Sequence, residues 1–162
     1  MFARPFIDSL DFARNCRSLS GKFSLSELPR LSDLLASNRG ILEYSLLGLA
    51  SNKGNPPMLV LSLDAECFLT CQRCLGEMSY PVHLHRRFAL QAHGQSSAVD
   101  DETDEYDVIE AESELDVLSL IEDELLLSLP YAAKHPEGDC QPIVEVTKKV
   151  SSPFAVLEKL KK

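Results

Sequence analysis

Four side chains that commonly ligate metals occur in two short clusters of this sequence. Cys71 and Cys74 are separated by two residues, and His135 lies five positions before Cys140. Thiolate and imidazole groups are the usual ligands of tetrahedral zinc, with a Zn–S distance of about 2.3 Å. A C-x-x-C turn lets both sulfurs face one ion, and the second cluster supplies two further ligands. The sequence therefore predicts one structural zinc site formed by Cys71, Cys74, Cys140 and His135.

Other interpretations of these residue types stay open. The cysteine pair can be two reduced thiols of a turn, or a redox pair, although redox motifs favour a helix N-terminus that lowers a thiol pKa. His83 and His85 share one face of a predicted strand, where they are alternative fourth ligands or ordinary half-exposed side chains. Cys16 and Cys67 are expected to be plain buried thiols, because free cysteine packs like a small hydrophobe.

The cysteine pair is predicted to lie in the turn of a β-hairpin. Alternating or apolar stretches separated by turn-forming residues predict three strands, at 41–50, 58–70 and 79–92. Successive strands with short connections favour an antiparallel meander. A short edge strand is predicted at 106–109, after an acidic loop. Residues 1–39 are mixed, with short helices on either side of Pro29.

One longer helix is predicted over residues 113–129. Ser113 is a suitable N-cap, and Asp116 can complete an approximate capping box. Pro130 ends the helix. The apolar stripe that faces the sheet is formed by Val117, Leu118, Ile121, Leu125 and Leu129. The predicted fold class is α+β, an antiparallel β-meander packed by one main helix, with a short C-terminal amphipathic helix.

The C-terminal helix is predicted to begin at Pro153, which suits a first helical turn. Phe154, Leu157 and Leu160 form its narrow apolar stripe. A helix of this length is marginal in water, so it needs a docking surface on this protein or on a partner. We expect residues 1–140 to form a single α+β domain, and residues 141–162 to form a linker and a helical tail.

Composition and charge exclude several classes of protein. The formal net charge is −9, which disfavours unassisted, non-specific binding to nucleic acid. No apolar run approaches the roughly 18 residues of a membrane span, and the first residues lack the hydrophobic region of a secretory signal. The five cysteines are then expected to be thiols of a reducing compartment. These features predict a cytoplasmic protein with no membrane partner.

Charged residues are segregated along the chain. Thirteen acids fall between Asp100 and Glu124, and three of them, at positions 122–124, are predicted to belong to a solvated helix face. Basic residues gather near both termini and around the cysteine hairpin. An acidic surface can attract a basic protein, basic segments can reach phosphate, and the simplest interpretation of the acidic balance is solubility.

Sequence motifs for catalysis are missing from the chain. It contains no glycine-rich phosphate loop, no G-x-S-x-G elbow and no H-E-x-x-H motif. The acids of the predicted helix are consecutive, so they point in different directions and do not pair on one substrate. We expect no enzymatic activity and no small-molecule substrate.

Three ordered segments carry a resemblance to a known family. They are the C-x-x-C turn at 71–74, the acidic and apolar helix that runs into Pro130 with His135 and Cys140 beyond it, and the closing segment 153–161. In these segments the chain resembles the bacterial YceD family, the large ribosomal RNA subunit accumulation proteins. Residues 1–39 match least distinctly. The resemblance implies a cytoplasmic, non-enzymatic factor needed for normal levels of large-subunit ribosomal RNA.

The expected function is therefore that of a ribosome-biogenesis factor that acts by binding. Its expected partner is large-subunit ribosomal RNA or a basic ribosomal protein. Alternatives are a chaperone-like binder of a basic ribosomal protein, acting through residues 100–124, and a thiol oxidoreductase with a C-x-x-C motif. The candidate partner-binding residues are Arg73, Arg86, Arg87, Phe154, Leu157 and Leu160.

Overall fold

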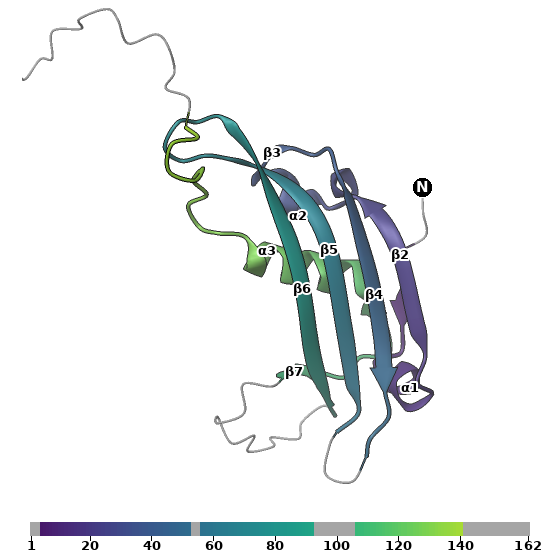
Figure 1. The fold of residues 1–162 in the computed structure, drawn as a ribbon. Coiled ribbons are helices and arrows are strands. Elements are labelled where there is room, and N and C mark those ends of the chain that lie inside the picture. The colour runs from purple at the N-terminus through teal and green to yellow at the C-terminus, as the bar shows by residue number, and fades with distance from the viewer. Residues whose placement is uncertain (1–3, 53–55, 93–105, 141–162) are drawn as a thin grey trace, which may run out of the picture.

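The computed structural model describes residues 4–52, 56–92 and 106–140. Strands make up most of the regular structure in these ranges (Figure 1). The strands are β1 (Phe6–Ile7), β2 (Ser18–Ser24), β3 (Leu35–Ser37), β4 (Ile41–Leu49), β5 (Met58–Thr70), β6 (Glu77–Gln91), β7 (Asp107–Glu110) and β8 (Leu115–Asp116). The helical elements are α1 (Ser9–Arg14), the 3-10 turn η1 (Leu25–Glu27), α2 (Pro29–Ser32) and α3 (Val117–Ser128). The architecture is α+β, as the sequence predicts.

The main sheet is mixed, and not purely antiparallel as predicted. Five of its six strands follow the order β2-β4-β5-β6-β7, while β3 pairs with the end of β5. The three long strands β4, β5 and β6 form an antiparallel meander, and β2 extends it. The edge strand β7 is present but runs parallel to β6. The connection from Gln91 to Asp107 is long enough for the crossover of about a dozen residues that parallel strands need.

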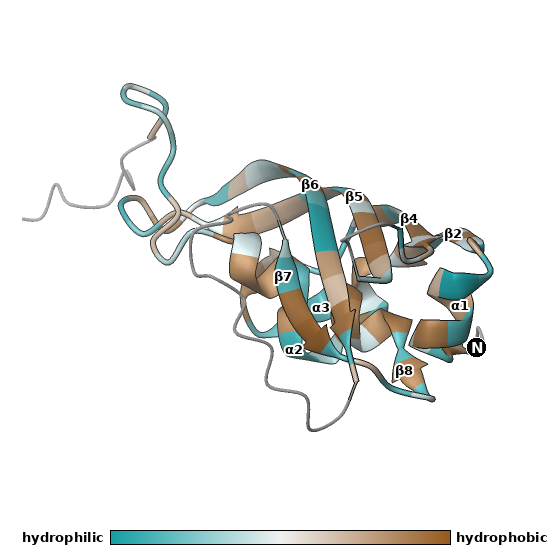
Figure 2. Cartoon of the chain, turned by 90° about the horizontal axis from the view of Figure 1, so that it is seen from below, coloured by the Kyte–Doolittle hydropathy of each residue, from teal (hydrophilic) through white to brown (hydrophobic). Residues whose placement is uncertain are grey.

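The sheet has one covered face and one open face. Along β4 and the first part of β5, every second residue is buried, as expected for strands that present one face to a core. α1, α2 and α3 lie on the same side of the sheet (Figure 2). Each large core side chain contributes roughly 2 kcal/mol through burial. Fully or almost fully buried core residues include Leu46, Leu61, Leu63, Phe88, Ile121 and Leu125.

The main helix begins four residues later than the sequence predicts. Its N-cap is Asp116, whose carboxylate accepts hydrogen bonds from the amides of Leu118 and Ser119. Ser113 does not cap it, because Leu115 and Asp116 extend as β8 and pair with β1. α3 has 12 residues. None of the helices in the described ranges combines the length and apolarity needed to cross a membrane.

The N-terminal region contains a strand that the sequence analysis missed. The side of β2 that faces the core presents Leu19, Gly21 and Phe23, which pair with buried positions of β4. Gly21 supplies no apolar signal, but it is needed there, because a Cβ would lie 2.9 Å from the ring of Tyr44. That ring stacks on Phe23, with centroids 5.2 Å apart. The short helices predicted around Pro29 are present as η1 and α2.

Two of the acids predicted to be solvated are buried instead. Glu122 is only 3% exposed, and its carboxylate accepts hydrogen bonds from the amides of Arg30 and Leu31 and from the Arg30 guanidinium. It therefore holds the start of α2 against α3. Glu124 is also buried and pairs with Arg86 of β6 at 3.3 Å. Burial raises the pKa of Glu124, and the charge of Arg86 opposes that rise.

The two carboxylates that contact Arg30 are predicted to differ in their contribution to stability. Glu122→Gln places an amide N–H₂ against guanidinium or backbone donors, so we expect a loss of about 2 kcal/mol and a fall in Tm of roughly 4–8 °C. Asp123 contacts the same guanidinium at 2.6 Å but is half exposed, so Asp123→Asn should cost at most about 0.5 kcal/mol. Thermal unfolding of both variants tests the contrast, and equal losses would contradict it.

Candidate metal centre

The turn between β5 and β6 carries the cysteine pair at the tip of a long hairpin (Figure 1). The amide of Cys71 donates to the carbonyl oxygen of Gly76 at 2.9 Å, and the amide of Leu75 donates to the carbonyl oxygen of Cys71 at 2.8 Å. Leu75 has a φ of 57°, so a leucine and not the following glycine takes the left-handed position. The turn curls tightly enough to bring both thiols into one cluster.

Residues 131–140 bring the second pair of candidate ligands to this turn. The amide of Gln72 donates to the carbonyl oxygen of Ala133 at 2.8 Å, which ties the segment after α3 to the hairpin tip. Further on, the amide of Asp139 donates to the carbonyl oxygen of Pro136 at 3.3 Å. Gly138 lies inside this turn with a φ of 96°, a conformation that favours glycine. The turn returns the chain so that Cys140 lies beside His135.

The four predicted ligand residues are brought together in one cluster. The sulfurs of Cys71 and Cys140 lie 3.7 Å apart, and Nδ1 of His135 lies 3.3 Å from the sulfur of Cys74 and 3.7 Å from that of Cys140. All four candidate ligand atoms lie within 4.8 Å of one another. Tetrahedral zinc with ordinary bond lengths needs S–S separations of about 3.8 Å and S–N separations of about 3.5 Å. The donor set and its spacing thus fit one tetrahedral metal ion.

His135 is oriented for ligation by its second ring nitrogen. Nε2 lies 3.3 Å from the carbonyl oxygen of Glu77. A carbonyl oxygen only accepts, so Nε2 carries the proton and Nδ1 directs its lone pair at the sulfurs. A backbone carbonyl that fixes the tautomer of a ligating histidine is common around metal sites. Hydrogen bonds to the sulfurs of Cys140 and Cys71 raise the pKa of His135, so a metal would have to displace a proton from this ring up to a higher pH than from an ordinary histidine.

Cys71 is prepared for ligation by backbone amides. Its side chain is fully buried, and burial opposes ionisation, but the amides of Cys74, His135 and Arg73 hydrogen-bond to its sulfur. Together these bonds outweigh burial and lower the pKa of Cys71 to about 5. Metals bind the thiolate and not the thiol. The turn therefore supplies a deprotonated ligand at neutral pH.

Arg73 joins the two halves of the cluster. Its Nε donates to the sulfur of Cys140 at 2.8 Å, and its terminal nitrogen donates to the carbonyl oxygens of His135 and Pro136. The hydrogen bond to Cys140 and the charge of that sulfur raise the pKa of Arg73. The sequence predicts Arg73 as a partner-binding residue. Its contact with Cys140 links positions 67 residues apart, so the sequence alone does not reveal that contact.

The remaining candidate residues lie away from the cluster. Cys67 is buried, as predicted, but Cys16 is exposed, which corrects the prediction of a buried thiol. Its φ of 47° places it in the tight connection between α1 and β2, where the thiol is turned away from the core. Arg86 contacts Glu124 on the covered face, and Arg87 is exposed on the open face. His93 and the tail residues Phe154, Leu157 and Leu160 lie outside the described residues.

His83 and His85 lie on the open face of the sheet, where each has a partner on β5. Nδ1 of His83 is 2.6 Å from the carboxylate of Asp64, and Nδ1 of His85 is 3.0 Å from the hydroxyl of Ser62. A serine beside a histidine is one part of a nucleophilic triad, in which a third group orients the base. Here the carboxylate of Asp64 contacts His83, whereas Ser62 contacts His85, so these four residues do not form a triad.

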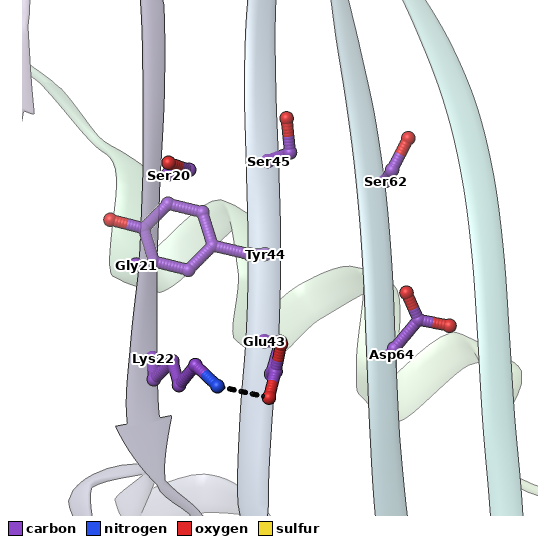
Figure 3. A pocket seen from close by; sticks show the side chains of 8 residues that line it. All are labelled: Ser20, Gly21, Lys22, Glu43, Tyr44, Ser45, Ser62 and Asp64. Atoms are coloured by element: carbon purple, nitrogen blue, oxygen red, sulfur yellow. Dashed lines mark hydrogen bonds and ion pairs between the residues drawn. The ribbon is translucent and has the colours of Figure 1, made fainter.

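A shallow hollow of about 300 Å³ crosses the same open face (Figure 3). Ser20, Ser45 and Ser62 lie next to one another on three adjacent strands, and Lys22 forms an ion pair with Glu43 below them. The hollow is open to solvent and its charged groups are paired, so it offers weak grounds for a ligand site. The metal-type cluster is the better candidate.

The fold and the cluster define a class of protein: an α+β domain on a mixed sheet, with a Cys₃His cluster of the metal-binding type at a hairpin tip. The family model described as Large ribosomal RNA subunit accumulation protein YceD matches residues 59–161, a range that includes all four cluster residues. The chain belongs to the YceD family.

A curated relative extends this similarity beyond the family model. The chain is 26% identical over 169 residues to the Large ribosomal RNA subunit accumulation protein YceD of Haemophilus influenzae. The alignment covers 96% of this chain and 94% of that protein, so it includes most of the N-terminal residues that the family model does not match. No solved structure was found to match the chain.

The left-handed residue of the turn gives a prediction about stability. Leu75 is 66% exposed, so little packing is lost when it is replaced, and asparagine adopts left-handed φ more readily than leucine. Leu75→Asn should raise stability by about 1 kcal/mol, or Tm by roughly 2–4 °C. The matched control is Leu127→Asn, since Leu127 is 77% exposed and has ordinary φ. A fall in Tm for Leu75→Asn would contradict the prediction.

Proposed function

We propose that the protein is a cytoplasmic ribosome-biogenesis factor that supports accumulation of large-subunit ribosomal RNA, acting by binding and not by catalysis. The observation that carries this proposal is membership of a family named for that role. The relative from Haemophilus influenzae has the same printed name and aligns with nearly the whole chain. The presence of four candidate protein ligands in the cluster supports the non-catalytic part of the proposal.

Zinc is the metal we propose for the cluster. Three thiolates and one imidazole are soft and borderline ligands that favour tetrahedral zinc, and the separations between them suit that geometry. Four protein ligands close the coordination sphere, whereas catalytic zinc sites keep one position for water or substrate. A closed site stabilises the fold. This zinc would therefore join the hairpin tip to the segment after α3 without performing chemistry.

The partner we propose is large-subunit ribosomal RNA or a basic ribosomal protein. Of the predicted partner-binding arginines, Arg73 and Arg86 already have contacts within the described structure. Arg87 forms no ion pair with any described residue and lies on the open face, opposite Val60 in the sheet register. It is therefore the arginine best placed to reach a phosphate or an acidic group. Phe154, Leu157 and Leu160 remain the proposed apolar contacts of the tail.

Two alternative functions have less support. A chaperone-like binder of a basic protein would use the acids of 100–124, but Glu122 and Glu124 are buried and paired. The acids of 100–105 lie outside the described residues. A thiol oxidoreductase would need an accessible cysteine pair, whereas the side chain of Cys71 is buried and both cysteines face two further candidate ligands.

The zinc proposal predicts the metal content of the purified protein. Protein prepared without chelators should contain about one equivalent of zinc by elemental analysis. Cys71→Ser and Cys140→Ser should each remove most of it, because each takes away one of the four ligands. Cys16→Ser is the matched control, since this thiol is exposed and outside the cluster. Full zinc content in Cys140→Ser would show that Cys140 is not a ligand.

The functional proposal predicts an effect of the tail in cells. Removal of residues 153–162 should lower the ratio of large-subunit to small-subunit ribosomal RNA, with only a small fall in the Tm of the purified protein, because a short helix contributes little to the core. Arg87→Gln should act in the same direction, and Arg14→Gln, an exposed arginine on α1, is its control. Normal ribosomal RNA in the truncated strain would contradict the role of the tail. A pull-down after nuclease treatment then separates the partners, since only a protein partner survives it.

A further inference from the structure

An apolar pocket lies beside the cluster, on the covered side of the domain. Its volume is about 370 Å³, near the lower end of typical ligand pockets. One wall comes from α3 and the residues after it, and the other from β5, the hairpin turn and the turn that follows α2. Most lining side chains are apolar: Leu34, Leu69, Leu126, Leu129, Pro130, Tyr131 and Ala133.

Two large side chains on the rim of this pocket are exposed to solvent. Tyr131 is fully exposed and Leu34 is 56% exposed, and both line the pocket. Two exposed side chains with large apolar parts on one rim make the pocket a candidate contact surface for a partner segment. Thr70 and Gln72 are the polar lining residues, and none of the described residues that line the pocket is charged. A site without lysine or arginine does not fit a nucleic-acid backbone, whose affinity comes from neutralised phosphates. The pocket suits apolar side chains of a protein segment.

The chain itself supplies such a segment in its C-terminal residues. The last described residue before that segment lies beside the pocket. Cys140 is the last described residue, and its sulfur lies 3.7 Å from that of Cys71. Gln72, the next residue after Cys71, lines the pocket. Residues 141–152 separate this point from Pro153 and can span at most roughly 40 Å. A short tether of this kind raises the effective concentration of the tail to the millimolar range.

We propose that the pocket is the docking site of this chain's own residues 153–162 when no partner is bound. Phe154, Leu157 and Leu160 give the segment one apolar face at helical spacing, which matches a neutral, apolar pocket. Millimolar effective concentration is enough to populate a weak contact that would be negligible between separate molecules. The inference rests on the proposed function, because the same residues are the proposed contacts with the partner. Docking in the pocket would therefore compete with partner binding.

The test uses the full-length chain, which contains no tryptophan. Phe154→Trp places a single fluorescent reporter on the apolar face of the tail. Docking predicts emission shifted to shorter wavelength and reduced quenching by acrylamide, both unchanged on serial dilution. Leu34→Asp on the pocket rim should return the emission to that of a solvated tryptophan. Leu127→Asp is the matched control, since Leu127 is 77% exposed on α3 and does not line the pocket.

Each other outcome overturns the inference. Emission of a solvated tryptophan in the parent reporter protein shows that the tail does not dock. A short-wavelength emission that is lost on dilution assigns the pocket to the tail of a second copy. Equal effects of the two aspartate substitutions show that the reporter contacts another surface. The ribosomal RNA measurement is independent, so loss of function on truncation combined with solvated emission would leave the proposed function standing and remove only the docking.

Discussion

β5 and β6 pair through thirteen successive residues, from Met58 opposite Ala89 to Thr70 opposite Glu77. Side chains alternate between the two faces of a sheet, so this single register decides which residues meet the helices. It sends Leu61 and Arg86 to the covered face and Ser62 and His85 to the open one. A slip of one residue would expose the core side chains and also misalign the ends of the turn. The core and the cluster thus depend on the same pairing.

Charge balance accounts for the position of Arg73 at the hairpin tip. Three thiolates and one neutral imidazole around a divalent ion leave a net charge of about −1. Arg73 contacts one of those sulfurs directly and donates to two carbonyl oxygens of the opposite segment. Arg73 would therefore offset this excess charge, and its hydrogen bonds already bridge the two chain segments that the metal would join. A lysine could supply the charge but not several donors in a fixed plane.

The cluster could be predicted from sequence because its signal is local. Two residues between Cys71 and Cys74, and four between His135 and Cys140, limit how far apart the ligands of each pair can lie. The long strands were predictable for the same reason, since alternation is a local pattern. The start of α3 was not, because β8 forms only when residues 6–7 pair with it. Glu122 was not predictable either, since its burial depends on amides of α2 that lie 91 and 92 positions away.

The cluster and the pocket are parts of one arrangement of the chain after α3. This helix is fixed in the core through Ile121 and Leu125, and the chain that follows passes the pocket wall before it reaches His135. Ala133 lines the pocket and accepts a hydrogen bond from Gln72, which lines it from the other side. A metal that holds His135 and Cys140 on the hairpin therefore also holds the two walls of the pocket together. Because coupling between two binding events is reciprocal, a segment that binds between those walls would in turn strengthen metal binding by the cluster.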